Sequence, residues 1–293
     1  MRLAHISDLH LLDLTGIKLS RLLTNRRILG GVNLLLRRAK EYRPEVLEVL
    51  VDDLIREGVD HIVVSGDISN LGLESEFERV FHLLKLLGDG TRVSVVPGNH
   101  DYYTAGAALT RRFEKTFYPF MFPNGFSDPD ADLYPYTKDL GDCLLVGACS
   151  AIKTQPLISH GRIGERQLQR LEQVLSDASS QGRMTCLVLH HALHIRDAMP
   201  EYTSRLLDRD AVLAMIHRCK VDLVMYGHDH HGVTWEREQP GKKTQFVCCG
   251  SSTRVTNDTS TVAKYRIYSI HNNRLRKLDT KIYDQSIRKF VLS

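Results

Sequence analysis

The sequence predicts an α/β fold in which short strands alternate with amphipathic helices. Short runs rich in Val, Ile and Leu recur along the chain, and segments with helical periodicity lie between them. The chain has 293 residues, which is enough to bury a sizeable core without disulfides or structural zinc. This alternation is typical of layered α/β proteins.

Strands are expected where the apolar runs are most concentrated. These runs cover residues 2–7, 61–66, 92–97, 143–149, 184–190 and 221–227. One helix is expected to run from Pro44, which suits a first helical turn, to Gly58, which suits a helix end. A second helix is expected over 165–178. Nearer the C-terminus, residues 239–241 and 272–273 are expected to form the turns of two β-hairpins.

Composition and charge narrow the range of functions. The net charge of +4 suits an anionic substrate but does not indicate nucleic-acid binding. The six cysteines have no C-x-x-C spacing and are expected to be reduced thiols. No basic-then-apolar leader precedes the first strand, and no apolar run approaches the length of a membrane span. We therefore expect a single cytoplasmic domain over 1–293, with peripheral contact at the inner membrane face and the oligomeric state left open.

Polar side chains directly follow five of the predicted strands. They are Asp8 and His10, then Asp67, then Asn99, His100 and Asp101, then His190, and finally His228 and His230. Ligands of open α/β sheets bind beyond the carboxyl ends of the strands, so these side chains are expected to converge. In an extended segment residues i and i+2 point the same way. Each of the pairs Asp8–His10 and His228–His230 could therefore bind one ion.

The types of side chain in this set indicate a metal site. Imidazole, carboxylate and amide oxygen without thiolate suit Mn, Fe, Zn or Co. Two divalent ions with Asp8 and Asp67 leave a residual charge of +2, or +1 with a bridging hydroxide, which would attract phosphate. Each cluster taken alone also fits an ordinary turn at a strand end. Their order along the chain favours the metal site.

The ordered set D-x-H, G-D, G-N-H-D, H and G-H-x-H resembles the calcineurin-like metallophosphoesterase superfamily. The resemblance spans residues 8–230, extends to 248–253, and implies a four-layer α/β/β/α sandwich of two mixed sheets flanked by helices. It implies two divalent ions, Mn first among them, held by Asp8, His10, Asp67 and His230 on one side and by Asp67, Asn99, His190 and His228 on the other. A hydroxide bridging the ions would attack the phosphate. His100 would contact the phosphate and protonate the leaving group, with Asp101 orienting its ring.

Other polar residues lie close to these motifs in the sequence. The family's H-x-P pattern selects His190 as the ligand over His191, although alanine replaces the proline here. His194 is a candidate for supporting the site. Asp229 is expected to point away from the metals. Arg254 is a candidate phosphate contact.

Within the superfamily, the motifs are most similar to two bacterial groups. One is the class III cyclic-nucleotide phosphodiesterases, which implies a nucleotide substrate. The other is the UDP-2,3-diacylglucosamine pyrophosphatases, which cleave a nucleotide–lipid anhydride at the membrane surface. A non-catalytic scaffold of the same fold is less favoured, because the whole ligand set is present. A nucleic-acid exonuclease is less favoured, because the chain leaves little room for extra capping segments.

Two segments bear on the substrate. Residues 11–43 carry eight basic side chains among Leu and Ile, and could rest on anionic lipid or grip an acylated, phosphorylated substrate. The alternative is a helical hairpin packed over the sheet edge. Residues 111–123 place Phe113, Phe117 and Phe120 at helical spacing, which predicts a buried face. The alternative there is an apolar wall for acyl chains or a nucleobase.

Overall fold

The computed structural model describes residues 1–15, 41–125, 132–155, 158–239 and 241–293. These residues form two six-stranded sheets flanked by helices. Of the eight basic residues singled out in 11–43, only Arg43 lies within the described ranges, so the interpretation of that segment falls outside them. No helix in those ranges is long and apolar enough to cross a membrane.

The first sheet mixes parallel and antiparallel strands in the order β12-β11-β10-β1-β2-β3. Its strands are β1 (Arg2–Ile6), β2 (His61–Val64), β3 (Val93–Val95), β10 (Lys264–Ile270), β11 (Leu275–Asp284) and β12 (Lys289–Leu292). Strand β2 pairs in parallel with both β1 and β3, while β10 pairs antiparallel with β1. The carboxyl ends of β1, β2 and β3 therefore lie at one edge.

The second sheet has the order β4-β5-β6-β7-β9-β8. Its strands are β4 (Tyr136–Asp139), β5 (Leu144–Gly147), β6 (Thr185–Val188), β7 (Leu223–Tyr226), β8 (Val233–Gln239) and β9 (Lys242–Cys248). Strands β5, β6, β7 and β9 are parallel neighbours. The antiparallel pairs β8–β9 and β10–β11 confirm the two predicted hairpins.

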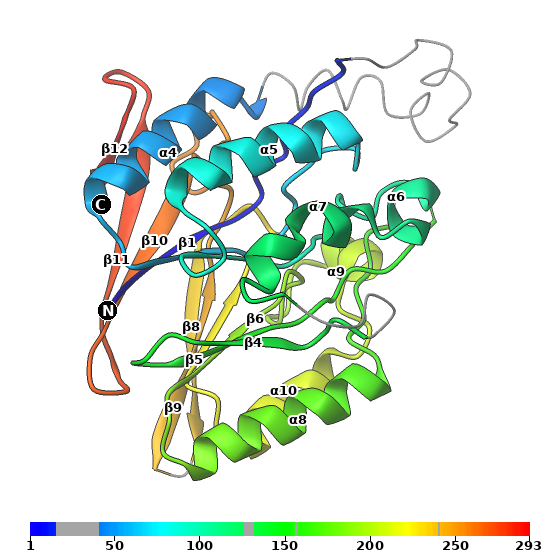
Figure 1. Cartoon of the computed structure of the whole chain (residues 1–293), viewed down its shortest axis with the longest axis vertical. Coiled ribbons are helices and arrows are strands. Elements are labelled where there is room, and N and C mark those ends of the chain that lie inside the picture. Colours follow the sequence, from blue (N-terminus) through cyan, green and yellow to red (C-terminus); the bar gives the residue numbers. More distant parts are fainter. Residues whose placement is uncertain (16–40, 126–131, 156–157, 240) are drawn as a thin grey trace.

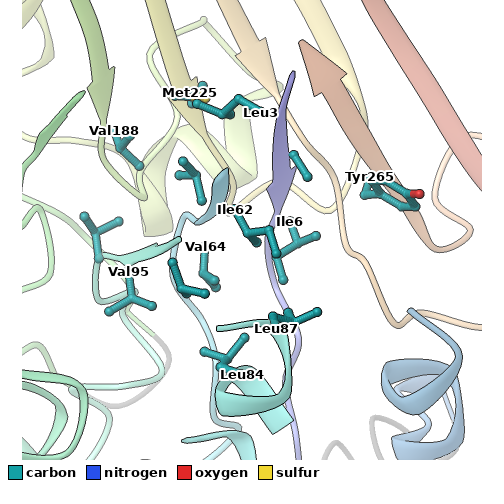
Figure 2. Close-up of a cluster of buried hydrophobic side chains, with 14 of the residues drawn as sticks. Leu3, Ile6, Ile62, Val64, Leu84, Leu87, Val95, Val188, Met225 and Tyr265 are labelled. Carbon is teal, nitrogen blue, oxygen red and sulfur yellow. The ribbon is translucent and has the colours of Figure 1, made fainter. Parts of the chain in front are cut away.

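The two sheets pack face to face, and helices cover their outer faces (Figure 1). Between the sheets, Leu3 of β1 shares a core with Val188 of β6 and Met225 of β7 (Figure 2). Helices α4 (Pro44–Glu57) and α5 (Glu74–Leu87) cover the first sheet, and α8 (Glu165–Ser180) and α10 (Arg209–Arg218) cover the second. This four-layer arrangement confirms the predicted fold class.

The helix signals in the sequence are confirmed at two helices that cover the first sheet. Helix α4 begins at Pro44 and is capped by Gly58, whose φ of 59° is a left-handed conformation that glycine adopts without strain. In α7 (Arg112–Met121), Phe113, Phe117 and Phe120 are fully buried against α5 and β3. The apolar-wall interpretation is therefore wrong for these three rings.

Candidate metal centre

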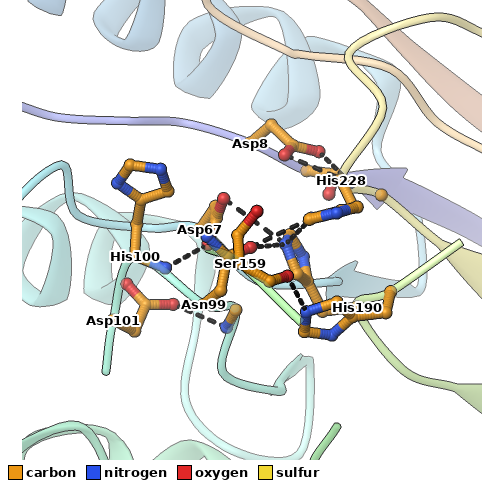
Figure 3. A network of polar contacts seen from close by, with 12 residues as sticks. Asp8, Asp67, Asn99, His100, Asp101, Ser159, His190 and His228 are labelled. Carbon is orange, nitrogen blue, oxygen red and sulfur yellow. Dashed lines mark hydrogen bonds and ion pairs between the residues drawn. The ribbon is translucent and has the colours of Figure 1, made fainter. Parts of the chain in front are cut away.

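The polar residues that follow β1, β2, β3, β6 and β7 meet where the carboxyl ends of strands from both sheets come together (Figure 3). They form two groups, Asp8, His10, Asp67 and His230 in one, and Asp67, His190 and His228 in the other. Within each group the possible ligand atoms lie within 4.8 Å of one another. Asn99 joins the second group, because its Oδ1 lies 2.9 Å from Nδ1 of His228 and 3.2 Å from Nε2 of His190.

Asp67 belongs to both groups through one oxygen atom. Its Oδ2 lies 3.7 Å from Nε2 of His10 and 3.4 Å from Nε2 of His190. The other oxygen, Oδ1, accepts a hydrogen bond of 2.8 Å from the backbone N–H of His100. Burial raises the pKa of Asp67, but the charges of His190 and His100 outweigh it and hold that pKa well below its ordinary value. Asp67 is thus an anionic side chain placed to bridge two cations.

Five of the candidate ligands have a left-handed backbone conformation. The φ angles are 51° at Asp8, 44° at His10, 51° at Asp67, 76° at His228 and 58° at His230. Each such residue costs about 1–3 kcal/mol, and such strain clusters at functional sites. The extended geometry predicted for residues 8–10 and 228–230 is therefore wrong. Asp8 and His10 still share one group, but the turn sends His228 and His230 into different groups.

The second ring nitrogen of each histidine in the second group binds a backbone carbonyl. Nδ1 of His190 donates to the carbonyl oxygen of Ser65 at 2.8 Å, and Nε2 of His228 donates to that of Ser204 at 2.8 Å. These bonds fix the ring orientation and leave the other nitrogen facing the group. Burial lowers the pKa of His190, but Asp67 outweighs it and raises the pKa to about 9.

His191 is placed differently from its neighbour His190. Its Nδ1 lies 2.8 Å from Oγ of Ser150, and its Nε2 lies 3.1 Å from the carbonyl oxygen of Ser159. Burial lowers the pKa of His191 to about 3, so the ring is neutral. Both ring nitrogens are engaged within the protein, and His190 is the histidine that faces the metal groups.

His100 lies beside the first group, but Asp101 does not orient its ring. Nδ1 of His100 donates to the carbonyl oxygen of Asn70 at 2.7 Å. The carboxylate of Asp101 accepts from the backbone N–H of Ser69 at 2.9 Å, from the Ser69 hydroxyl at 2.8 Å and from the N–H of Gly98 at 2.9 Å. The predicted role of Asp101 is therefore wrong. It ties together the loops that follow β2 and β3, and so supports Asp67 and Asn99.

Asp229 points away from the metal groups, as expected. Its Oδ2 forms an ion pair of 2.9 Å with Nε2 of His194, and its Oδ1 accepts from Arg196 at 2.6 Å. His194 also lies 2.9 Å from the hydroxyl of Tyr226, at the end of β7. These contacts anchor the turn between the two histidine ligands. Arg254 forms an ion pair with Glu41 at 3.0 Å, so its guanidinium is already held by a carboxylate.

The side chains present fit a pair of divalent cations. Nε2 of His10 and Nε2 of His230 lie only 2.9 Å apart, and Oδ1 of Asp8 lies 3.4 Å from the latter. Nitrogen and carboxylate atoms that converge this closely match the ligand preferences of Mn, Fe, Zn and Co. The structure brings together all seven predicted ligands.

Several residues that shape the site were not identified from the sequence. The carbonyl groups of Ser65, Asn70 and Ser204 orient His190, His100 and His228. Every residue type carries a carbonyl, so no sequence signal identifies them. Tyr42 was also missed: its hydroxyl lies 2.7 Å from Nδ1 of His230.

Comparison with known proteins gives a consistent result. A family model described as calcineurin-like phosphoesterase matches residues 1–232. A dimetal phosphatase from Danio rerio is similar in structure, with a TM-score of 0.61, 16% identity, and coverage of 95% of this chain and 94% of that one. A purple acid phosphatase from yellow lupin (Lupinus luteus) has a TM-score of 0.61 and 15% identity, with coverage of 99% of this chain and 52% of that one. This chain thus spans about half the length of the lupin protein.

GAP50, the anchor in the inner membrane complex of Plasmodium, is similar with a TM-score of 0.52 and 13% identity, covering 99% of this chain and 86% of that one. At these identities the structural likeness shows a shared fold. No curated protein sequence matches the chain. The family model, in contrast, covers well over half of the sequence and includes all the candidate ligands. The chain belongs to the calcineurin-like phosphoesterase family.

Proposed function

We propose that this protein hydrolyses a phosphodiester or phosphoanhydride bond in a nucleotide or nucleotide-linked substrate, using two divalent ions, Mn²⁺ first among them. The observation that carries the proposal is Oδ2 of Asp67, which lies within 3.7 Å of a histidine nitrogen from each ligand group. Two such ions, when bound, supply a nucleophile from water at neutral pH and neutralise charge on the phosphate.

The site residues have separate roles in holding the ions and in donating a proton. Asp8, His10 and His230 would hold one ion, Asn99, His190 and His228 the other, and Asp67 both. The ring of His100 lies 4.7 Å from that of His10 and stacks on Tyr103 at 5.5 Å. Nδ1–H of His100 donates to the carbonyl oxygen of Asn70, which orients the ring beside the first ligand group. His100 is therefore the candidate proton donor.

One observation favours the more specific alternative of a UDP-2,3-diacylglucosamine pyrophosphatase. Large apolar side chains are exposed on the segment that leads into and forms α9 (Ala198–Ser204): Ile195 at 79%, Met199 at 72% and Tyr202 at 76%. The same segment supplies the Ser204 carbonyl that holds His228. Exposed apolar side chains grouped beside a site favour an apolar ligand. An acylated substrate would bring apolar chains that this surface could contact, whereas a cyclic nucleotide carries none.

A turnover panel on the Mn²⁺-loaded protein tests both proposals. It compares bis-p-nitrophenyl phosphate, cyclic AMP and UDP-2,3-diacylglucosamine, with Asn99→Ala as the variant that loses a ligand and Gly106→Ala as the matched variant away from the metal groups. Selective cleavage of the lipid-linked nucleotide, weakened by Met199→Ser with Tyr202→Ser, would support the pyrophosphatase. Cleavage of the small diesters alone would support the soluble phosphodiesterase. If a protein that binds two Mn²⁺ ions cleaves none of the three, the proposed activity is wrong and a scaffold role is favoured.

A further inference from the structure

The three histidines His190, His228 and His230 differ in what holds the ring nitrogen that points away from the ligand groups. For His190 and His228 the partner is a backbone carbonyl, which no substitution removes. For His230 it is the phenolic oxygen of Tyr42, 2.7 Å from Nδ1. Partners of this kind orient metal-binding histidines and tune their basicity. Tyr42 is thus the one side chain among these three contacts that can be changed.

Tyr42 is built into the site rather than resting on its surface. Tyr42 is buried, with only 4% of its surface exposed. Its ring centroid lies 4.6 Å from that of His10 and 5.7 Å from that of His230, in edge-on geometry in both cases. Within the described part of the chain, Tyr42 therefore contacts both histidines of the first ligand group.

The backbone around Tyr42 is tied to the segment that also holds the backbone of Asp8 and Leu9. Tyr42 forms an antiparallel bridge with Arg254, and the N–H of Val255 donates to the carbonyl oxygen of Glu41 at 2.6 Å. The ion pair of 3.0 Å between Arg254 and Glu41 closes the same contact. We refer to residues 41–43 and 253–255 together as the clasp.

The clasp is joined directly to the first ligand segment. The hydroxyl of Thr253 donates to the carbonyl oxygen of Leu9 at 2.7 Å, and that of Ser251 donates to the carbonyl oxygen of Asp8 at 2.8 Å. Residues 251–255 thus hold the backbone of Asp8 and Leu9, directly before His10, as well as the tyrosine that contacts His230. This gives the arginine singled out in the sequence a role in holding Tyr42 through Glu41.

We infer that Tyr42 is a positioning residue for the first metal site: its phenolic oxygen accepts the Nδ1 proton of His230 and so directs the unprotonated Nε2 at the ion shared with Asp8, His10 and Asp67. The inference rests on the proposed two-metal centre. It assigns the clasp to one of the two sites only, because the second nitrogens of His190 and His228 are held by carbonyls elsewhere.

The test uses Tyr42→Phe, which removes the phenolic oxygen and keeps the ring. The matched control is Tyr268→Phe, because the hydroxyl of Tyr268 lies 3.1 Å from Nδ1 of His5, a buried histidine outside both ligand groups. Calorimetric titration of the metal-free full chain with Mn²⁺ measures each site. We expect the affinity of one site to fall about 10–100-fold in Tyr42→Phe while the other is unchanged, with both unchanged in Tyr268→Phe.

Two further measurements separate positioning from a structural role. Thermal unfolding of the metal-free protein should be similar in Tyr42→Phe and Tyr268→Phe, whereas the rise in melting temperature on adding Mn²⁺ should be smaller only in Tyr42→Phe. Excess Mn²⁺ should restore the two-ion stoichiometry. Unchanged affinities in Tyr42→Phe, or equal losses at both sites, would overturn the role of Tyr42 alone. A wild-type protein that binds fewer than two Mn²⁺ ions would overturn the two-metal centre itself, and Tyr42 with it.

Discussion

Gly98 has no side chain, and this leaves room for Asp67 beside it. A methyl group at position 98 would lie 2.1 Å from Oδ1 of Asp67 and 2.3 Å from its backbone nitrogen. Ordinary contacts of this kind begin at 3.4 Å. Rotating the Asp67 side chain relieves only the first clash, so the backbone of one loop must shift by about 1 Å in Gly98→Ala.

The shift acts on the carboxylate that both ligand groups share. Overpacking of this size costs about 1–3 kcal/mol of stability, and a displacement of about 1 Å at reacting groups lowers turnover about 100-fold. It also strains the hydrogen bond of 2.8 Å from the His100 N–H to Oδ1 of Asp67. We therefore expect Gly98→Ala to weaken Mn²⁺ binding at both sites, in contrast to Tyr42→Phe, which should weaken one.

The assay combines Mn²⁺ titration by calorimetry, hydrolysis of bis-p-nitrophenyl phosphate, and urea unfolding. Gly106→Ala is the matched control, because its new methyl group would meet nothing closer than Oγ1 of Thr104 at 4.0 Å. It should leave metal binding and turnover unchanged. If Gly98→Ala binds two Mn²⁺ ions with wild-type affinity and keeps wild-type turnover, then Asp67 does not bridge the two groups and the reasoning fails.

Three further predictions concern single side chains. His100→Ala should lower turnover about 10²–10⁴-fold while Mn²⁺ stoichiometry stays at two, because its ring lies outside both ligand groups. Burial lowers the pKa of His61 from 6.5 to about 3, so its stabilising contribution is complete above pH 6.5 and is lost as the pH falls toward 3. Between pH 7.5 and pH 5, urea unfolding of the metal-free wild type should therefore lose about 2 kcal/mol more than that of His61→Gln. Lys138→Met should lower the free energy of unfolding by roughly 2–4 kcal/mol, because three buried backbone carbonyls that accept from its ammonium at 2.5–2.7 Å lose their donor.

Each of these has a result that contradicts it. A parallel loss of Mn²⁺ and turnover in His100→Ala would make His100 part of the metal-binding structure. The same pH dependence in His61→Gln as in the wild type would mean that His61 is protonated in the folded protein. A stable Lys138→Met protein would show that the carbonyls of Gly90, Val93 and Phe120 find other partners.

The positions of the strands along the chain and the identity of the ligand residues follow from local sequence patterns. In β7, Leu223 and Met225 face the core between the sheets, while Val224 and Tyr226 face the core under α8 and α10. A strand buried on both faces is mostly apolar, so it appears as an apolar run followed by polar residues. Strands β1, β2 and β6 are also largely buried, with His5, His61 and Thr185 as polar exceptions, and the ligand residues stand out directly after these runs.

The arrangement of those ligands depends on contacts between distant parts of the chain. His190 is oriented by a carbonyl 125 positions away and His230 by a tyrosine 188 positions away. The left-handed backbone at Asp8 and His228 decides whether neighbouring ligand residues belong to the same group. Residue spacing does not reveal this, because an argument from spacing assumes a regular backbone. Asp101 likewise lies next to His100 in sequence yet binds the loop after β2. Residue types and their order are local properties, whereas the second partner of each site residue is set by how the two sheets pack, and only the folded chain brings those partners together.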